Sequence, residues 1–284
     1  MKNIISMILA VCCLLLSTQA LAQVEVRIQP DRKEFLLGEN VAFNVRIDNY
    51  TDRSISFVNI PGHSWLHFTL TRSGESQPIT PALIPNFPKL TVPAGSTRVV
   101  KACLRPYYTL NRDGVYKVVA TVRMPDMRTN YSSNRASFTL AHGGTVRTFT
   151  VESRGVRLNM SLRLLRVGGK DCLFGQVINA DSQSVLGACF MGQYLNFMKP
   201  RIVLDSAQNM HVLCQSTPEY FTYSKMNNQG QRVDYKVMKR TGGPVDLVSA
   251  NGGIRAVGLV PYVRPQESGS APIFTTADRP GGNK

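Results

Sequence analysis

The chain of 284 residues lacks the patterns that mark common catalytic sites. It contains no G-x-S-x-G, H-E-x-x-H or P-loop motif, and no G-x-G-x-x-G motif follows a strand-like segment. Acidic residues are also scarce, with 18 Asp and Glu against 33 Lys and Arg, and glycoside hydrolysis needs two acids flanking one cleft. These absences predict a protein without a cofactor, and they favour binding or structural work over catalysis.

Long apolar runs are equally scarce, because only the segment from Ile4 to Leu16 is almost unbroken. A lysine before this run and Ala20-Leu21-Ala22 after it complete the pattern of a secretory signal peptide over residues 1–22. No other stretch approaches the roughly 18 apolar residues of a transmembrane helix. We therefore predict cleavage before Gln23, no membrane span after cleavage, and a secreted or periplasmic protein.

The excess of positive charge is spread evenly along the chain. Residues 23–155 hold 17 basic and 10 acidic side chains, and residues 156–284 hold 15 and 8. An even spread argues against a dedicated nucleic-acid site, which would gather Lys and Arg into one stripe. It permits attraction to an anionic polysaccharide or to another extracytoplasmic protein, and it is also the pattern of a well-solvated basic surface.

Four cysteines remain after removal of the predicted signal peptide: Cys103, Cys172, Cys189 and Cys214. No C-x-x-C or Cys/His spacing indicates a metal site. Four cysteines outside the cytoplasm allow three full disulfide pairings. Three of them lie in the second half, which favours one bridge among Cys172, Cys189 and Cys214. Apolar neighbours surround all four, so buried thiols are an equal alternative.

Alternation of apolar and polar residues predicts an all-β first module over residues 23–155. The alternation is clear at Val24–Ile28 and Val41–Ile47, and Val115–Val122 is the most β-prone run. Four prolines between Pro78 and Pro88 indicate an irregular crossing, because proline cannot donate to a strand ladder. Eight or nine short strands without a convincing amphipathic helix favour two packed antiparallel sheets.

The second module, residues 156–263, is organised around a segment that occurs twice. Pro200–Cys214 is partly repeated by Pro244–Gly258, and each copy reads as a strand, a tight polar turn and a strand. Between them, Asn227–Gly230 predicts the turn of a hairpin. A period of about 40–45 residues indicates blade-like β repeats. The second module as a whole is too short for the four blades of about 40 residues that a closed propeller needs. We therefore predict a stack of blade-like antiparallel sheets.

Two polar segments delimit this second module. The run Glu152–Gly155 predicts the boundary with the first module. Residues 264–284 are rich in Pro, Gly and Ser and show no apolar periodicity, which predicts a disordered tail.

The first module resembles the immunoglobulin-like domains of secreted bacterial proteins in two short stretches. Phe35–Val41 leads into an alternating strand as in their first hairpin, and Leu110–Tyr116 resembles their tyrosine-corner region. The repeats of the second module resemble propeller blades of the sialidase type. The resemblance implies an N-terminal Ig-like β-sandwich followed by blade-like antiparallel sheets, and it implies no function.

The candidate ligand-binding residues are mostly aromatic. Trp65, the only tryptophan, is a sugar-stacking platform or, more commonly for such a residue, part of the core. Tyr220, Tyr223 and Tyr235 are numerous enough to form a sugar- or peptide-binding face, although alternating strands turn half of such residues inward. His211 has apolar neighbours, which favours a structural histidine over a catalytic one.

Three further polar residues invite a chemical interpretation. His63 and His67 are four residues apart, which on a strand places them on one face about 13 Å apart, too far to share a metal ion. Asp205 precedes a turn, where an aspartate commonly accepts backbone hydrogen bonds, and a general acid is the alternative.

Taken together, these features predict a non-catalytic binding or scaffold protein outside the cytoplasm. One alternative is a polysaccharide-active enzyme related to sialidase-like blades. Another is a secreted protease inhibitor, whose inhibitory loop would be Pro78–Pro88.

Overall fold

A computed structural model describes residues 23–124, 129–250 and 253–262, and every regular element among them is a strand. The predicted all-β fold is therefore confirmed. Within these ranges no helix has the length and apolar character needed to cross a membrane. The predicted signal peptide and C-terminal tail lie outside the described residues.

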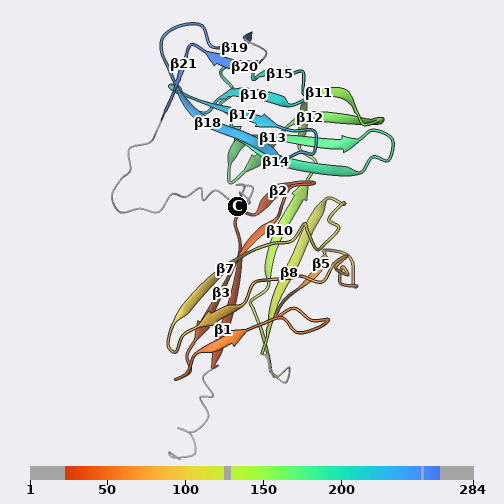
Figure 1. The fold of residues 1–284 in the computed structure, drawn as a ribbon, viewed down its shortest axis with the longest axis vertical. Helices are drawn as coiled ribbons and strands as arrows, with labels where there is room; N and C mark the ends of the chain where they lie inside the picture. Colours follow the sequence, from red (N-terminus) through yellow and green to blue (C-terminus); the bar gives the residue numbers. More distant parts are fainter. Residues whose placement is uncertain (1–22, 125–128, 251–252, 263–284) are drawn as a thin grey trace, which may run out of the picture. The chain divides into compact units, whose positions relative to one another are not determined.

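The chain forms two compact units, each with its own set of strands (Figure 1). Of the described residues, the first unit contains 23–31, 41–109, 116–124 and 129–137, and the second contains 32–40, 110–115, 138–250 and 253–262. Strands wholly or mainly in the first unit are β1 (Val24–Pro30), β3 (Ala42–Asn49), β4 (Ile55–Phe57), β5 (Leu66–Arg72), β6 (Leu90–Val92), β7 (Thr97–Cys103), β8 (Gly114–Arg123) and β9 (Asn130–Ser132). Those of the second are β2 (Glu34–Leu36), β10 (Ala136–Ala141), β11 (Gly144–Ser153), β12 (Val156–Val167), β13 (Lys170–Asn179), β14 (Val185–Gln193), β15 (Arg201–Leu204), β16 (Met210–Gln215), β17 (Tyr220–Met226), β18 (Arg232–Arg240), β19 (Asp246–Ala250), β20 (Gly253–Val257) and β21 (Leu259–Pro261).

In the first unit, antiparallel strands contribute rings to one core. β3 pairs with β1 and β7, β8 pairs with β5 and β9, and β4 pairs with β6. Alternation along β3 buries Phe43 and leaves Asn44 exposed, as the sequence predicts. The rings of Phe43 and Phe68 lie 6.5 Å apart, which joins β3 and β5 across the core. The Tyr108 hydroxyl donates to the Phe68 carbonyl at 2.6 Å and fixes the long loop beside β5.

The second unit is a stack of four sheets that face one another in the manner of propeller blades. The stack begins with the parallel pair β2 and β10, continues with β11–β12–β13–β14 and β15–β16–β17–β18–β21, and ends with the β19–β20 hairpin (Figure 1). In both central sheets, strands β11 to β14 and β15 to β18 each pair with the next strand along the chain, which is the strand order of a blade.

Apolar side chains fill all three seams of this stack. Leu36 of β2 packs on Phe174, and methionines from both central sheets, among them Met191 and Met210, meet in the middle seam. Leu247 of the last hairpin packs on Phe221. Each fully buried side chain of this size contributes about 1.5–3 kcal/mol, so the apolar residues of the seams stabilise the unit.

Both predicted copies of the repeat are strand–turn–strand hairpins. The first copy forms β15 and β16, and the second forms β19 and β20. The hairpin predicted across Asn227–Gly230 is also present and joins β17 to β18. The Asn227 side chain accepts hydrogen bonds from the backbone N–H groups of Gln229 and Gln231, at 3.0 and 2.9 Å, and Gly230 adopts a φ of 76°.

The boundary predicted at Glu152–Gly155 is wrong, because these residues form a hairpin turn inside the second unit. Arg154 and Gly155 have φ values of 52° and 74°, as a two-residue turn between twisted strands requires. β11 therefore pairs with β12 and packs Phe149 and Val151 against the middle seam. The polar run is a turn signal, and a turn signal does not distinguish a linker from a hairpin.

Gly230 provides a test of the close contact between β14 and the β17–β18 turn. A Cβ atom on Gly230 would lie 2.4 Å from the Gly187 carbonyl carbon, a backbone atom. We expect Gly230→Ala to lower the free energy of unfolding by about 2–5 kcal/mol, from the left-handed φ and the overlap together. Urea unfolding followed by circular dichroism measures the loss.

Gly169→Ala is the matched control for this experiment. Gly169 has a φ of 80°, yet a Cβ atom there would meet nothing within 4 Å. We expect it to lose only about 1–2 kcal/mol. Equal losses for the two variants would contradict the packing role of Gly230.

Candidate functional site

Trp65 lies in the core of the first unit and is not exposed for sugar stacking. Its side chain is 2% exposed and stacks on Phe57 with ring centroids 5.5 Å apart. The indole N–H donates to the Pro88 carbonyl at 3.1 Å, which satisfies the one polar atom of the ring. The sequence left two interpretations of Trp65, a sugar-stacking platform and a core residue, and this burial matches the core residue.

The three candidate tyrosines do not share one face. Tyr223 is opposite Lys236 and Tyr235 is opposite Ser224, so Tyr223 and Tyr235 point to opposite sides of the sheet. Tyr220 lies beside Tyr262, with ring centroids 4.7 Å apart. These side chains therefore do not form a continuous aromatic platform.

The four cysteines are present as thiols, and three of them are buried. Burial raises the pKa of Cys214 to about 12 and also raises the pKa of Cys172. Because the thiolate is the nucleophile and the metal ligand, such thiols are poor at both tasks. The described ranges contain no group of three or more His, Cys, Asp or Glu side chains placed to hold a metal ion.

His211 belongs to a buried hydrogen-bond network in the second unit. Its Nε2 lies 2.9 Å from the Asp205 carboxylate, and its Nδ1 lies 2.7 Å from the Tyr223 hydroxyl. Lys225 is 3.1 Å from the same carboxylate, and Asn209 donates to it from both backbone and side chain. Asp205 thus accepts turn hydrogen bonds, as predicted, and the network reaches two strands beyond the turn.

The protonation states in this network are those of a satisfied structural cluster. Burial acts to raise the pKa of Asp205, but hydrogen bonds from His211, Asn209 and Lys225 more than offset it and hold the pKa well below its usual range. Burial, with nearby acidic charge, raises the pKa of Tyr223 to about 12. Tyr223 therefore keeps its proton, and its hydroxyl donates a hydrogen bond to His211 Nδ1. The Nε2–H group of His211 in turn donates a hydrogen bond to the Asp205 carboxylate.

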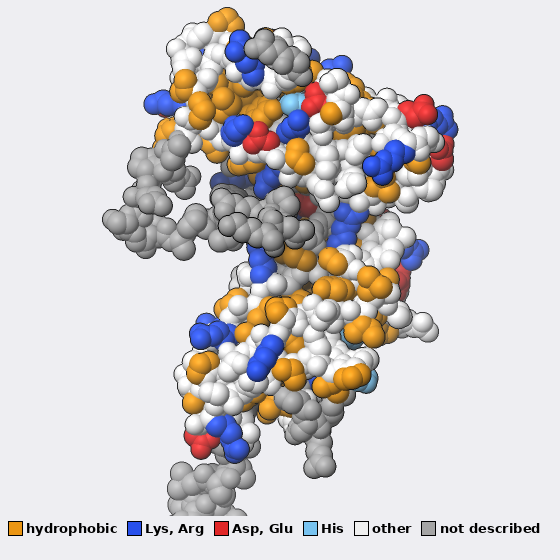
Figure 2. All heavy atoms as spheres, in the orientation of Figure 1, with side chains coloured by type: hydrophobic (Ala, Val, Ile, Leu, Met, Phe, Trp, Pro, Cys, Tyr) orange, Lys and Arg blue, Asp and Glu red, His pale blue; other side chains and the backbone are white. Residues whose placement is uncertain are grey.

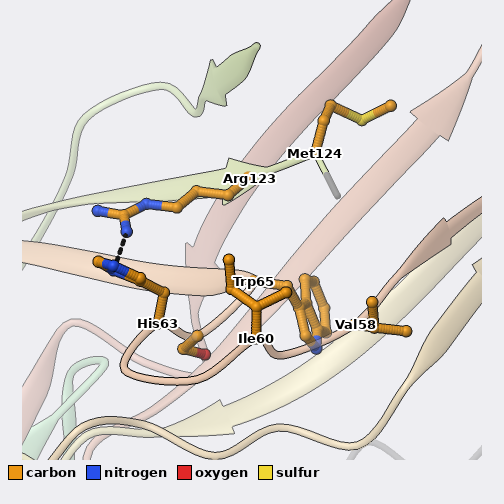
Figure 3. A pocket seen from close by; sticks show the side chains of 7 residues that line it. Val58, Ile60, His63, Trp65, Arg123 and Met124 are labelled. Carbon is orange, nitrogen blue, oxygen red and sulfur yellow. Dashed lines mark hydrogen bonds between the residues drawn. The ribbon is translucent and has the colours of Figure 1, made fainter. Parts of the chain in front are cut away.

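A second polar group lines a cavity in the first unit. His63, His67 and Arg123 surround a hollow of about 190 Å³ together with Gly62, Ser64 and a wall formed by Pro81, Ile84 and Pro85. A narrower crevice of about 10 Å³, the size for one water, adjoins the same residues and reaches Trp65. Figure 3 shows the crevice, with the His63 ring facing the Arg123 guanidinium and the indole of Trp65 farther along.

The local backbone explains how the two histidines come to share this cavity. The 13 Å estimate assumed an extended segment, but Ile60 and His63 pair in a tight turn and β5 begins only at Leu66. His67 then lies on the outer face of β5, between the buried Leu66 and Phe68. Both histidines line the cavity, and the prediction that they are too far apart to share a metal ion stays a prediction.

Arg123 reaches the cavity through the pairing of β5 with β8. His67 is opposite Thr121, and the backbone N–H of Arg123 donates to the Trp65 carbonyl at 2.8 Å, which continues the same register. Because Thr121 and Arg123 are two residues apart on one strand, His67 and Arg123 lie on the same face of the sheet. Sequence reasoning missed Arg123, because the residues are 56 positions apart and only strand register joins them. The available signal was a histidine at an outward position of a predicted strand.

The cavity has a positive character, to which Arg123 contributes a permanent charge. Arg123 Nη1 lies 3.1 Å from His63 Nδ1, so the neutral His63 ring accepts there and carries its proton on Nε2. Burial, followed by the charge of Arg123, lowers the pKa of His67. A bound anion would favour the protonated form of the His67 ring, which couples binding to proton uptake.

The Asp205 network makes a testable contribution to stability. We expect Asp205→Asn to lower the free energy of unfolding by about 1–3 kcal/mol at pH 7, because buried donors lose a charged acceptor. The folded pKa of Asp205 is lowered, so its contribution is present above the pKa of an unfolded aspartate, about 3.9, and is lost as pH falls below it. Urea titrations at pH 7 and pH 3 should show the difference between the two proteins shrinking.

Asp181→Asn is a suitable control for this measurement. Asp181 also pairs with a cation, Arg157, but its side chain is 55% exposed. An exposed pair contributes about 0–1 kcal/mol, so this variant should behave almost as the parent protein. A loss at Asp205 no larger than that at Asp181 would argue against the buried network.

Comparison with known proteins adds no functional assignment to either group of residues. No protein-family model matches the chain, and no curated protein matches it.

Proposed function

We propose that this chain is a secreted or periplasmic binding protein, without a catalytic role, whose ligand carries negative charge. The observation that carries the proposal is the convergence of His63, His67 and Arg123 on one cavity of about 190 Å³. Clusters of cationic donors in a concave site recognise carboxylate, sulfate or phosphate groups.

The charge of the whole protein supports an anionic ligand. The formal net charge is +15, and Figure 2 shows Lys and Arg side chains outnumbering Asp and Glu on the visible face. A positive surface potential raises the local concentration of an anion and accelerates its encounter with the site. The cavity then provides the specific contacts that an even surface charge lacks.

A binding role fits the chemistry better than the enzyme alternative. The one buried His–Asp–Tyr arrangement is internally satisfied, and Tyr223 retains its proton because its pKa is raised to about 12. The cavity is lined by His63, His67 and Arg123, which bind negative charge, and by Ser64, whose Oγ accepts a hydrogen bond from the backbone N–H of Leu66 at 3.3 Å. A polysaccharide-active enzyme of the sialidase type therefore remains the second hypothesis.

The proposed architecture is an Ig-like sandwich in the first unit and blade-like sheets in the second. Facing rings in the first core and the blade order of β11 to β18 support it. In such folds the loops at the ends of strands commonly carry binding sites, and the cavity combines loop residues with His67 of β5 and Arg123 of β8.

Calorimetric titration with trigalacturonate, sulfate and N-acetyl-leucine tests the proposal. We expect at least one of these anions to bind and to be recovered unchanged, and we expect Arg123→Gln to weaken its binding by about tenfold or more. Affinity should rise as pH falls from 8 to 5.5, because the pKa of His67 is lowered in the free protein and an anion restores its proton.

Arg98→Gln is the matched control, since it removes one exposed positive charge from β7, away from the cavity. It should leave binding nearly unchanged. Equal losses in both variants, or no binding of any of the three anions, would contradict the proposal. Release of shorter sugars from trigalacturonate would favour the enzyme hypothesis instead.

A further inference from the structure

We propose that the ligand of the cavity is the C-terminal end of another protein chain, held through its terminal carboxylate and its last apolar side chain. This inference rests on the proposed anion-binding function and specifies the class of anion. It follows from the two contrasting walls of the cavity, one cationic and one apolar.

The cationic wall suits a single planar carboxylate. Within the described residues, the recorded partner of the Arg123 guanidinium is His63 Nδ1, at 3.1 Å, which leaves other N–H groups of the fork for a bidentate pair. With Nδ1 occupied as an acceptor, His63 presents an Nε2–H donor. His67 supplies a second ring, and a bound anion would favour uptake of a proton from solvent by that ring.

The apolar wall is a loop segment whose backbone is restrained while its apolar side chains are exposed. Ile84 lines the cavity although 61% of it is exposed, and the adjacent Leu83 is 63% exposed. Prolines at 81 and 85 restrict the backbone around them, and the Ala82 N–H donates to the Tyr107 carbonyl at 2.7 Å. Apolar side chains presented on a restrained loop bind with a small loss of conformational entropy.

Leu83 distinguishes a macromolecular partner from a small molecule. It does not line the cavity, yet it is exposed and directly precedes Ile84, which does. A ligand confined to the cavity would leave this side chain in water. A protein chain that enters by its end would cover Leu83 with the residues that precede its terminus.

The same cavity is poorly suited to an oligosaccharide. Sugar rings commonly pack on exposed faces of Trp, Tyr or Phe, and none of these is among the described residues that line the hollow. Trp65, the nearest indole, is 2% exposed. A volume of about 190 Å³ is also below the roughly 300–1,000 Å³ of sites for drug-sized ligands, which suits one terminal residue better than several sugar rings.

The test compares four probes on the mature chain by calorimetric titration. They are acetyl-Ala-Ala-Leu with a free carboxylate, the same peptide as its C-terminal amide, octanoate and trigalacturonate. We expect the free acid to bind about tenfold or more tightly than its amide, in line with the value of a charged hydrogen bond, and more tightly than octanoate or trigalacturonate. Arg123→Gln should abolish the difference between acid and amide.

A second pair of variants separates the apolar contact from the charge. Ile84→Ser should weaken binding of the leucine-ended peptide several-fold and leave binding of acetyl-Ala-Ala-Gly unchanged. Leu83→Ser should leave the binding of both short peptides unchanged. Both positions are exposed, so neither variant removes core packing.

The outcomes distinguish this inference from the proposed function. Arg123-dependent binding of trigalacturonate or sulfate without binding of the peptide acid would overturn the inference and leave the anion-binding function intact. Octanoate binding as tightly as the peptide acid would identify a small monocarboxylate and would also overturn it. If none of these anions binds, both the inference and the proposed anion-binding function are overturned.

Discussion

The two central sheets of the second unit have apolar residues on both faces, and each of these faces must be removed from water. β13 illustrates the constraint, because Phe174 packs toward β2 while Leu173 and Val177 pack into the middle seam. A sheet with two apolar faces is stable only between two covers. The short strand β2 and the β19–β20 hairpin provide those covers, which explains why a three-residue strand from early in the chain belongs with the C-terminal sheets.

The same constraint determines how polar residues behave on a covered face. His211 is on the face that the last hairpin covers in part, and it is 2% exposed. A buried imidazole without partners would cost stability, so Asp205 and Tyr223 satisfy both ring nitrogens. His67 is in the opposite situation, since it lies on an outward face beside a cavity and its ring has no such closed set of partners among those recorded. Two histidines on strands thus acquire different roles from the surfaces that face them.

Much of the fold was predictable from local patterns. Alternation located β1, β3, β5 and β8, and the repeated segment located both hairpins of the last two sheets, because period-2 burial and turn chemistry are local properties. The site was far less predictable. Trp65, Tyr220, Tyr223 and Tyr235 were selected by residue type, and strand register placed them in a core or on separate faces. Arg123 was missed because its proximity to His67 depends on a strand pair formed by residues distant in sequence.

The sequence by itself determined the all-β class, the positions of most strands, the blade-like hairpins and the excess of positive charge. These follow from the spacing of apolar residues, from turn residues such as Asn227 and Gly230, and from simple composition. The tertiary structure alone decided that β11 belongs with β12, that β2 covers the C-terminal sheets, and that His63, His67 and Arg123 meet at one cavity. The reason is physical: local sequence sets which residues extend and which turn, whereas burial of every apolar face sets which distant segments come together.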